Sequence, residues 1–304
     1  MNKPKKPSWY ILGAGAIGCL WAAYLRQAGF PVVLIAKKPN AQTTLTLNNV
    51  SGKHQFSVIY KTTKQLSEKI DYLLLSTKAQ QTEQALTEIK AHLSHQASVL
   101  VLQNGLASEL LPQHLPTQKL FAAVTTDGAY RTEAHTVTHA GIGKTLIGPL
   151  DPTTKNTCTA LIQQLPLAFL SIECCHDIKQ QQWKKLAINC VINGLTAIYQ
   201  CRNGELLTIN QASQQLNALC EETFTIIDAL GVSIGDSAQT LYNDVHSACT
   251  TTANNYSSMY QDIKHKRPTE IDFINGYLCT LAKKNALNCP ENTHILKSIK
   301  QLEQ

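Results

Sequence analysis

The chain has 304 residues, of which 43% are hydrophobic and 16% charged, and its formal net charge is +6. It contains no apolar run near the ~18 residues that span a bilayer, no secretory signal and no aromatic-interleaved basic stripe. Membrane, secreted and nucleic-acid-binding proteins are therefore disfavoured, and a cytoplasmic protein is expected. The length accommodates two domains, and the mildly positive charge suits anionic small molecules.

The first half of the chain alternates short apolar runs with helical patterns. Strands are expected at 8–12, 32–36, 71–76, 98–103 and 120–126, and helices at 16–28 and 80–93. Alternation of this kind favours a parallel sheet covered by helices. Beyond residue 130, the runs 136–139 and 144–148 flank a Gly-containing turn and are expected to form an antiparallel addition.

The second half shows helical periodicity with almost no strand signal. Helices are expected at 177–191, 205–230, 236–264 and 270–285. The fold class is therefore α/β, with a Rossmann-type dinucleotide-binding domain followed by an all-helical C-terminal domain. We expect residues 1–175 to form the first domain, with 1–7 as a flexible tail, and residues 176–304 to form the helical substrate and catalytic domain. A cleft between two such domains is a favoured ligand site.

A glycine-rich loop lies between the first expected strand and the first helix. Its G-x-G-x-x-G pattern consists of Gly13, Ala14, Gly15, Ala16, Ile17 and Gly18. The first glycine permits a tight turn, the second allows backbone to approach a pyrophosphate, and the third allows the helix to pack on the strand. The helix N-terminus offers N–H groups to phosphates. The pattern predicts a dinucleotide site, the alternative being a turn that binds no nucleotide.

The end of the second expected strand reads Ala36-Lys37-Lys38. An NAD site usually carries an acidic residue here, which binds the ribose 2′-hydroxyl. A carboxylate would repel a 2′-phosphate, whereas Lys37 and Lys38 attract it. These lysines favour NADP(H), unless they are ordinary loop charges.

A polar stripe runs along the first helix of the second domain. Lys185, Asn189 and Asn193 recur every four residues, so they share one helix face. The residues around the asparagines are apolar, and buried polar groups need hydrogen-bond partners. Partial desolvation would disfavour the ammonium form of Lys185 and move it toward the range of a general acid. The alternative is an asparagine network that only ties helices together.

A second polar stripe is expected further along the chain. Asn255, Ser258 and Asp262 are spaced i, i+3 and i+7 on the expected helix, and Glu270 stands at the start of the next one. Two helices that present polar stripes in one domain predict a polar ligand between them.

Apart from the pairs His92/His95 and His135/His139, the ten cysteines and ten histidines show no metal-ligand spacing. The scattered cysteines are expected to be small buried apolar residues. The pairs His92/His95 and His135/His139 are expected on solvated faces of a helix and a strand, so no metal site is predicted.

Taken together, these motifs resemble the ketopantoate reductase family over nearly the whole chain. The segments that carry the resemblance are Gly13–Gly18, Ser76-Thr77-Lys78-Ala79, Gln103-Asn104-Gly105, the run 185–193, Asn203-Gly204-Glu205-Leu206, the run 255–259 and the run 269–276. One departure is Gly194, which stands where many members have proline and is expected to loosen the helix end.

The resemblance implies NADPH-dependent reduction of 2-dehydropantoate (ketopantoate) to pantoate in pantothenate and coenzyme A biosynthesis. It implies that Lys185 is the general acid and that Glu270 is critical for catalysis. The substrate-binding positions that it implies are Asn104, Asn189, Asn193, Asn203, Asn255 and Ser258. The implied cofactor-binding positions are Gly13, Ala14, Gly15, Ala16, Ile17, Gly18, Lys37, Lys78, Asn104 and Glu270.

Two other functions fit the same plan. One is a related NADP-dependent reductase of another small 2-keto acid, and the other is a sensor that binds NADP(H) without turnover. For the ketopantoate reductase and for the related reductase, the expected partner is a small-molecule 2-keto acid. No nucleic-acid or membrane partner is expected. The chain is expected to be a monomer or a homodimer.

Overall fold

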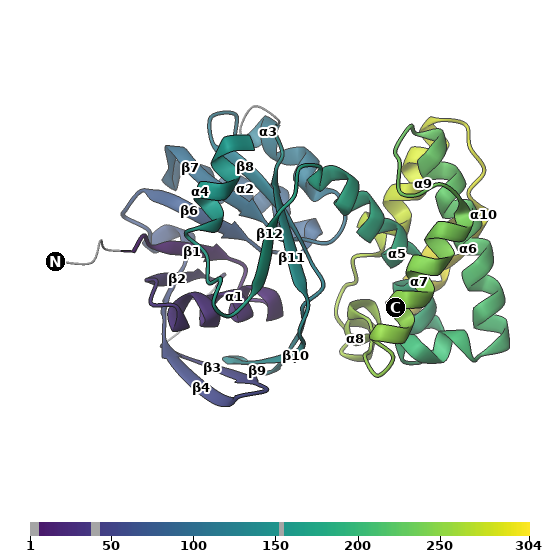
Figure 1. The fold of residues 1–304 in the computed structure, drawn as a ribbon, viewed down its shortest axis with the longest axis horizontal. Coiled ribbons are helices and arrows are strands. Elements are labelled where there is room, and N and C mark those ends of the chain that lie inside the picture. Colours follow the sequence, from purple (N-terminus) through teal and green to yellow (C-terminus); the bar gives the residue numbers. More distant parts are fainter. Residues whose placement is uncertain (1–5, 38–42, 152–154) are drawn as a thin grey trace. The chain divides into compact units, whose positions relative to one another are not determined.

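The computed structural model describes residues 6–37, 43–151 and 155–304. The chain divides into two units, Met1–Gln103 with Ala107–Lys179, and Asn104–Leu106 with Gln180–Gln304. The expected fold class is confirmed, since a parallel sheet with helices is followed by a helical region (Figure 1). The segment Asn104–Leu106, expected in the first domain, belongs to the second unit. Lys38 and residues 1–5 of the expected tail lie outside the described residues.

Within the described part of the first unit, eight strands form the larger sheet. They are β1 (Trp9–Leu12), β2 (Val32–Ile35), β5 (Ile59–Lys61), β6 (Ile70–Leu75), β7 (Leu93–Val101), β8 (Lys119–Thr125), β11 (Lys144–Pro149) and β12 (Ser171–Cys174). Their order is β12-β11-β8-β7-β6-β1-β2-β5. The strands from β5 to β8 are parallel, and β11 joins β8 antiparallel. The strand order therefore reverses beside β1, where this fold binds its ligands.

Strand β1 is apolar throughout because both faces of the sheet are covered. Trp9 and Ile11 face one buried cluster, and Tyr10 and Leu12 face the other. Helices α1 (Ala16–Gln27) and α4 (Lys155–Ile162) contribute to the first cluster, and α2 (Thr82–Ile89) and α3 (Leu111–His114) to the second. Helix α1 also contacts the second sheet, so it lies between two sheets (Figure 1).

The second sheet was not predicted. Its strands are β4 (Gly52–Ser57), β3 (Thr44–Asn49), β10 (Thr136–Gly141) and β9 (Gly128–Glu133), in that order. The expected pairing of 136–139 with 144–148 is wrong, because β10 lies in this sheet and β11 in the larger one. Gly143 explains the switch: its N–H donates to Asp127 Oδ1 at 2.9 Å, and a Cβ there would lie 2.4 Å from the Thr126 carbonyl carbon.

The expectation that His139 lies on a solvated face is also wrong. His139 is 7% exposed, and its two ring nitrogens lie 2.7 Å from Tyr24 Oη and 3.0 Å from Asp127 Oδ1. Strand alternation directs His139 inward, where α1 supplies a hydroxyl and the turn after β8 supplies a carboxylate. Cys174, expected to be buried, is exposed on the edge strand β12.

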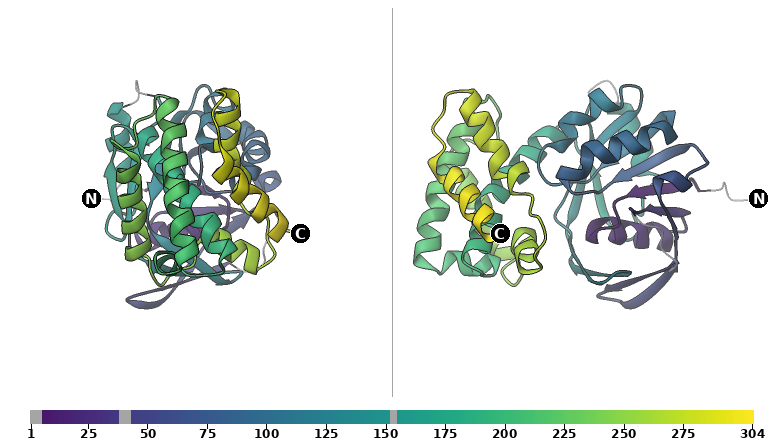
Figure 2. Two further views of the ribbon diagram at one scale, coloured as in Figure 1. Left: turned by 90° about the vertical axis from the view of Figure 1, so that its right-hand side faces the viewer. Right: turned by 180° about the vertical axis from the view of Figure 1, so that it is seen from behind.

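The second unit consists of helices (Figure 2). They are α5 (Ile178–Ile198), η6 (Asn203–Leu207), α6 (Asn210–Ala229), α7 (Ala238–Thr251), α8 (Ser258–Lys264), η7 (Ile271–Phe273), α9 (Asn275–Lys284) and α10 (Pro290–Leu302). Helix α5 supplies much of the buried core, including Leu186, Cys190 and Leu195. Among the described residues, no helix combines the length and apolar character needed to cross a membrane.

Two expectations about these helices are wrong. The expected helix 236–264 is interrupted between Thr251 and Ser258, where Ser257 Oγ accepts a hydrogen bond from the Tyr260 N–H at 3.1 Å and caps a new helix. Gly194 does not loosen the end of α5, which continues to Ile198. A Cβ at Gly194 would lie 2.3 Å from Ile295 Cγ2, so glycine allows α10 to pack closely.

Candidate active site

The glycine loop lies at the carboxyl end of β1, beside the end of β6. The Ser76 N–H donates to the Leu12 carbonyl at 2.9 Å, and Ser76 Oγ donates to the Gly13 carbonyl at 2.9 Å. These bonds hold the loop at the place where the strand order reverses. The loop therefore occupies the position at which Rossmann-type folds bind dinucleotides.

The three glycines have different roles. Gly13 has φ +115°, and a Cβ there would lie 2.7 Å from the Ser76 carbonyl carbon. A Cβ at Gly18 would lie 2.0 Å from the Gly13 carbonyl oxygen, so the fold itself requires both glycines. Gly15 has extended backbone, and a Cβ there would meet nothing within 4 Å. Neither strain nor packing requires glycine at position 15, whereas the close approach of a ligand would require it.

The N-terminus of α1 fits an anion. Gly15 is the N-cap residue and provides no side-chain cap, and the first turn contains no acidic residue. The first N–H groups of a helix lack partners within the helix, and the helix dipole favours negative charge there. This donor set suits the diphosphate of a dinucleotide.

Two lysines follow strands that flank β1. Lys37 is exposed directly after β2, and Lys78 precedes the short helix η2 (Ala79–Gln81) after β6. Since the carboxyl ends of neighbouring parallel strands meet at one edge, both lysines belong to the same edge of the sheet as the glycine loop.

In the second unit, the predicted stripe lies on α5. Lys185 and Asn189 are half-buried, and Asn193 is 7% exposed. One turn further on, the buried Thr196 Oγ1 donates to Ser257 Oγ at 2.7 Å. This bond fixes the start of α8 against the end of α5.

Asn203 and Asn255 lie together. The Asn203 N–H donates to the Asn255 carbonyl at 3.0 Å, and Asn203 Nδ2 donates to Thr252 Oγ1 at 2.8 Å. Asn203 Oδ1 is buried and has no hydrogen-bond partner among the described residues. An acceptor in this state is an exception in native proteins and suits a ligand that donates a hydrogen bond.

The predicted stripe of Asn255, Ser258 and Asp262 is only partly correct. Asn255 lies in the segment before α8, while the exposed Ser258 begins that helix. Asp262 is buried and accepts a hydrogen bond from Arg267 Nε at 3.0 Å. Asp262 therefore has an ionic partner within the protein.

Asn104 and Glu270 meet in the second unit. Asn104 Nδ2 donates to Glu270 Oε2 at 3.0 Å. The next residue, Gly105, has φ +72°, and a Cβ there would lie 2.7 Å from the Phe273 carbonyl oxygen. Glycine at 105 thus allows the segment that carries Asn104 to approach the segment that carries Glu270.

The segment before Glu270 is fixed by the last helix. The Thr269 N–H and Oγ1 both donate to Glu303 Oε1 at 2.7 Å, and Thr269 is 5% exposed. Burial opposes ionisation of Glu303, but the bonds from Thr269 and Lys300 outweigh it, and the pKa of Glu303 is lowered.

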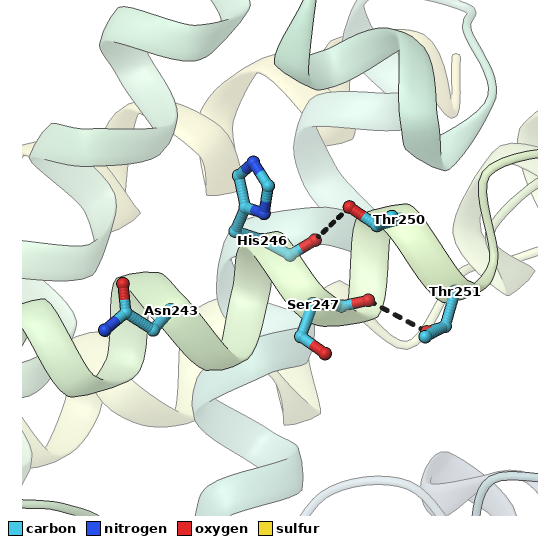
Figure 3. A pocket seen from close by; sticks show the side chains of 5 residues that line it. All are labelled: Asn243, His246, Ser247, Thr250 and Thr251. Atoms are coloured by element: carbon cyan, nitrogen blue, oxygen red, sulfur yellow. Dashed lines mark hydrogen bonds between the residues drawn. The ribbon is translucent and has the colours of Figure 1, made fainter.

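A depression with a volume of about 370 Å³ lies on α7, and no predicted site residue lines it (Figure 3). Its lining residues are Asn243, His246, Ser247, Thr250 and Thr251. All five are exposed, and the threonine hydroxyls donate to carbonyl oxygens one turn earlier, at 2.9 Å in each case. These hydroxyls serve their own helix, so the depression is not the candidate site.

Several positions that support the site were not predicted. Ser257 had a usable signal, because serine before a helix is a common N-cap. Thr196 and Glu303 act through partners distant in the sequence, at 61 and 34 positions, so no local pattern marks them.

The fold and these side chains define a class: a Rossmann-type α/β unit with a glycine loop at its switch point, joined to a helical unit that presents polar groups. The family model "Ketopantoate reductase PanE/ApbA" matches residues 9–152, and its C-terminal counterpart matches residues 177–303. The chain belongs to the ketopantoate reductase family, and it is an oxidoreductase.

Individual relatives agree with this assignment. A 2-dehydropantoate 2-reductase of Vibrio cholerae is 35% identical, with 97% of each chain covered. One from Archaeoglobus fulgidus is 29% identical, with 96% of this chain and 97% of the relative covered. The solved ketopantoate reductase of Ralstonia eutropha is 27% identical with a TM-score of 0.85, covering 97% of this chain and 98% of that one. D-mandelate dehydrogenase, solved with NADH and anilino(oxo)acetate, shares the fold at 24% identity, with a TM-score of 0.89 and the same coverage.

Proposed function

We propose that this protein reduces 2-dehydropantoate to pantoate with NADPH as the hydride donor. The observation that carries the proposal is the stripe of Lys185, Asn189 and Asn193 on α5, half-buried to buried, in a chain of the ketopantoate reductase family. A lysine among amides suits a reaction in which negative charge develops on a ketone oxygen.

The first unit fits the cofactor. Gly15 leaves room for the diphosphate, and the uncapped N-terminus of α1 supplies N–H donors. The exposed Lys37 offers a positive charge at the end of β2, which favours a 2′-phosphate over a bare ribose hydroxyl. The bound reduced nicotinamide supplies a hydride. Lys78 is the cationic residue after β6 that we assign to the same cofactor.

The second unit fits the keto acid. We assign Lys185 as the group that stabilises the developing alkoxide and donates the proton to it. Glu270, held by Asn104 at 3.0 Å, accepts a hydrogen bond from the substrate hydroxyl. The amides of Asn189 and Asn193 and the hydroxyl of Ser258 supply donors for the carboxylate and the remaining polar atoms.

Asn203 and Asn255 complete the substrate set. The buried Asn203 Oδ1 lacks a partner among the described residues, and the one hydroxyl of ketopantoate is a donor that it could share with Glu270. Ketopantoate carries such a hydroxyl, whereas pyruvate and 2-ketoisovalerate do not. A substrate without the hydroxyl would leave the buried Asn203 oxygen without a partner, and a site of this kind discriminates strongly against such substrates.

The test is the oxidation of NADPH with ketopantoate, beside pyruvate, 2-ketoisovalerate and oxaloacetate, and repeated with NADH. The Lys185→Ala variant should lose at least about a hundredfold in kcat while its Kd for NADPH stays unchanged. Lys184→Ala, the neighbouring lysine of α5, is the matched control and should retain turnover.

Other outcomes would replace the proposal. Preference for another keto acid would assign the chain to a related reductase of the same plan. NADPH binding without turnover on every substrate would favour a sensor. Full turnover by Lys185→Ala would remove the lysine from the proton-transfer step.

A further inference from the structure

Arg131 in β9 reaches the glycine loop from the second sheet. Its Nη1 donates to the Ala14 carbonyl at 2.7 Å, its Nε donates to the Glu133 carbonyl at 3.3 Å, and its Nη2 donates to the Ala134 carbonyl. Glu133 is the last residue of β9, Ala134 lies in the turn between β9 and β10, and Ala14 lies in the loop after β1. The guanidinium therefore links the second sheet to the glycine loop.

The contact with Ala14 determines the orientation of the next amide. In a trans peptide the carbonyl oxygen and the following N–H point in opposite directions. The Ala14 carbonyl points toward Arg131 and also accepts a weak bond from Cys19 Sγ at 3.5 Å. The Gly15 N–H must then point away from Arg131, and no hydrogen bond among the described residues uses it. Gly15 is also the glycine whose missing side chain leaves open space.

Arg131 also brings positive charge to this end of α1. The first turn of α1 contains no acidic residue that would offset it. The charge is felt by neighbouring groups: burial raises the pKa of Tyr60 to about 12 and that of Cys19 to about 11, while Arg131 acts in the opposite direction on both. A cation here adds to the partial positive charge of the helix N-terminus, so both attract an anion such as the cofactor diphosphate.

We infer that Arg131 is a positioning residue of the dinucleotide site, which holds the Ala14–Gly15 peptide with its N–H directed toward the cofactor diphosphate. This inference rests on the proposed binding of a nicotinamide dinucleotide at Gly13–Gly18. It separates two phosphate-binding tasks in the first unit. Lys37 serves the 2′-phosphate, and Arg131 serves the diphosphate by orienting the loop.

Fragments of the cofactor separate the two tasks, because ADP contains the diphosphate and 2′-AMP contains only the 2′-phosphate. Dissociation constants for ADP, 2′-AMP, NADH and NADPH would be measured by calorimetry. Arg131→Met should weaken ADP, NADH and NADPH by the same factor, roughly tenfold, because one oriented charge-assisted contact is lost. Binding of 2′-AMP should change less than about twofold.

Two further variants control for charge and folding. Arg131→Lys keeps the charge but cannot bridge three carbonyls, so it should recover only part of the affinity for ADP. Lys53→Met removes one exposed positive charge from β4 in the same unit and should leave all four constants unchanged. Thermal unfolding of each variant verifies that it is folded. If Arg131→Met does not fold, the ADP affinity of Arg131→Lys is the test.

Three results would overturn the inference. The first is unchanged ADP affinity in Arg131→Met, and the second is a loss of affinity in Arg131→Met that is confined to NADPH and 2′-AMP. The third is full recovery of ADP affinity in Arg131→Lys, which would show that the charge alone is the cause. Failure of the unaltered protein to bind ADP or NADPH would instead refute the proposed function, so the two failures are distinguishable.

Discussion

The side-chain amide of Asn104 donates a hydrogen bond from Nδ2 to Oε2 of Glu270 at 3.0 Å, although 166 positions separate the two residues. Asn104 follows β7 of the first unit in the sequence, yet it belongs to the second unit with Glu270. The bond orients the Asn104 side-chain amide and the Glu270 carboxylate relative to each other. Two polar groups held in this way are expected to act together in the proposed site.

A double-mutant cycle would test this relationship. Asn104→Ala and Glu270→Ala should each lower kcat/KM, and the double variant should lose less than the sum of the two free-energy changes. We expect a coupling energy of about 1–2 kcal/mol, as is usual for residues in direct contact. Strict additivity would show that the two residues act independently. The pair Asn104 and Lys184 provides a cycle in which additivity is expected.

Glu303 is expected to position Glu270 through Thr269. Glu303→Gln replaces a carboxylate that accepts two bonds from Thr269. Because the adjacent Glu270 would be less well oriented, kcat with ketopantoate should fall about tenfold with little change in the Kd for NADPH. Glu291→Gln, near the other end of α10, is the control and should retain kcat. A variant that lost thermal stability while keeping its kcat would show that Glu303 has only a structural role.

The glycine loop allows stability to be separated from binding. Gly13→Ala should destabilise the protein by about 2 kcal/mol or more, since φ is +115° and the new Cβ would meet the backbone of Ser76 and Thr77, directly after β6. Gly15→Ala should leave the unfolding midpoint nearly unchanged, because its Cβ meets nothing within 4 Å. Gly15→Ala should nevertheless weaken NADPH binding at least about tenfold, since the methyl group would obstruct the diphosphate. Equal NADPH affinity in Gly15→Ala would place the diphosphate elsewhere.

The buried Asp127 predicts a pH dependence of stability. Burial disfavours its charged form, but hydrogen bonds from His139, Gly143 and Thr125 outweigh burial and lower its pKa below the usual 3.8. A carboxyl whose pKa is lower in the folded state stabilises the protein above its unfolded-state pKa, and this contribution is lost as the pH falls through the folded-state value.

Asp127→Asn should therefore lower the free energy of unfolding by about 2–3 kcal/mol near neutral pH. The difference from the unaltered protein should shrink as the pH falls below about 4. Denaturant titrations at several pH values measure this, and Asp236→Asn, an exposed carboxylate in the second unit, is the control. A difference that stayed constant down to about pH 2 would show that Asp127 contributes through packing alone.

The sequence by itself determined the features that local patterns carry. Apolar runs defined the central strands β1, β2 and β6, the glycine spacing located the phosphate loop, and the four-residue spacing of Lys185, Asn189 and Asn193 placed them on one helix. Each of these depends on residues within about four positions of one another, where backbone periodicity dictates which side chains share a face.

Only the tertiary structure decided which distant residues meet. It placed Asn104 beside Glu270, directed His139 inward and interrupted the expected helix before Asn255. It also brought Arg131 from β9 to the Ala14 carbonyl. These outcomes depend on how sheets and helices pack and on buried polar groups finding partners, and that free energy comes from groups that no local stretch of sequence contains together.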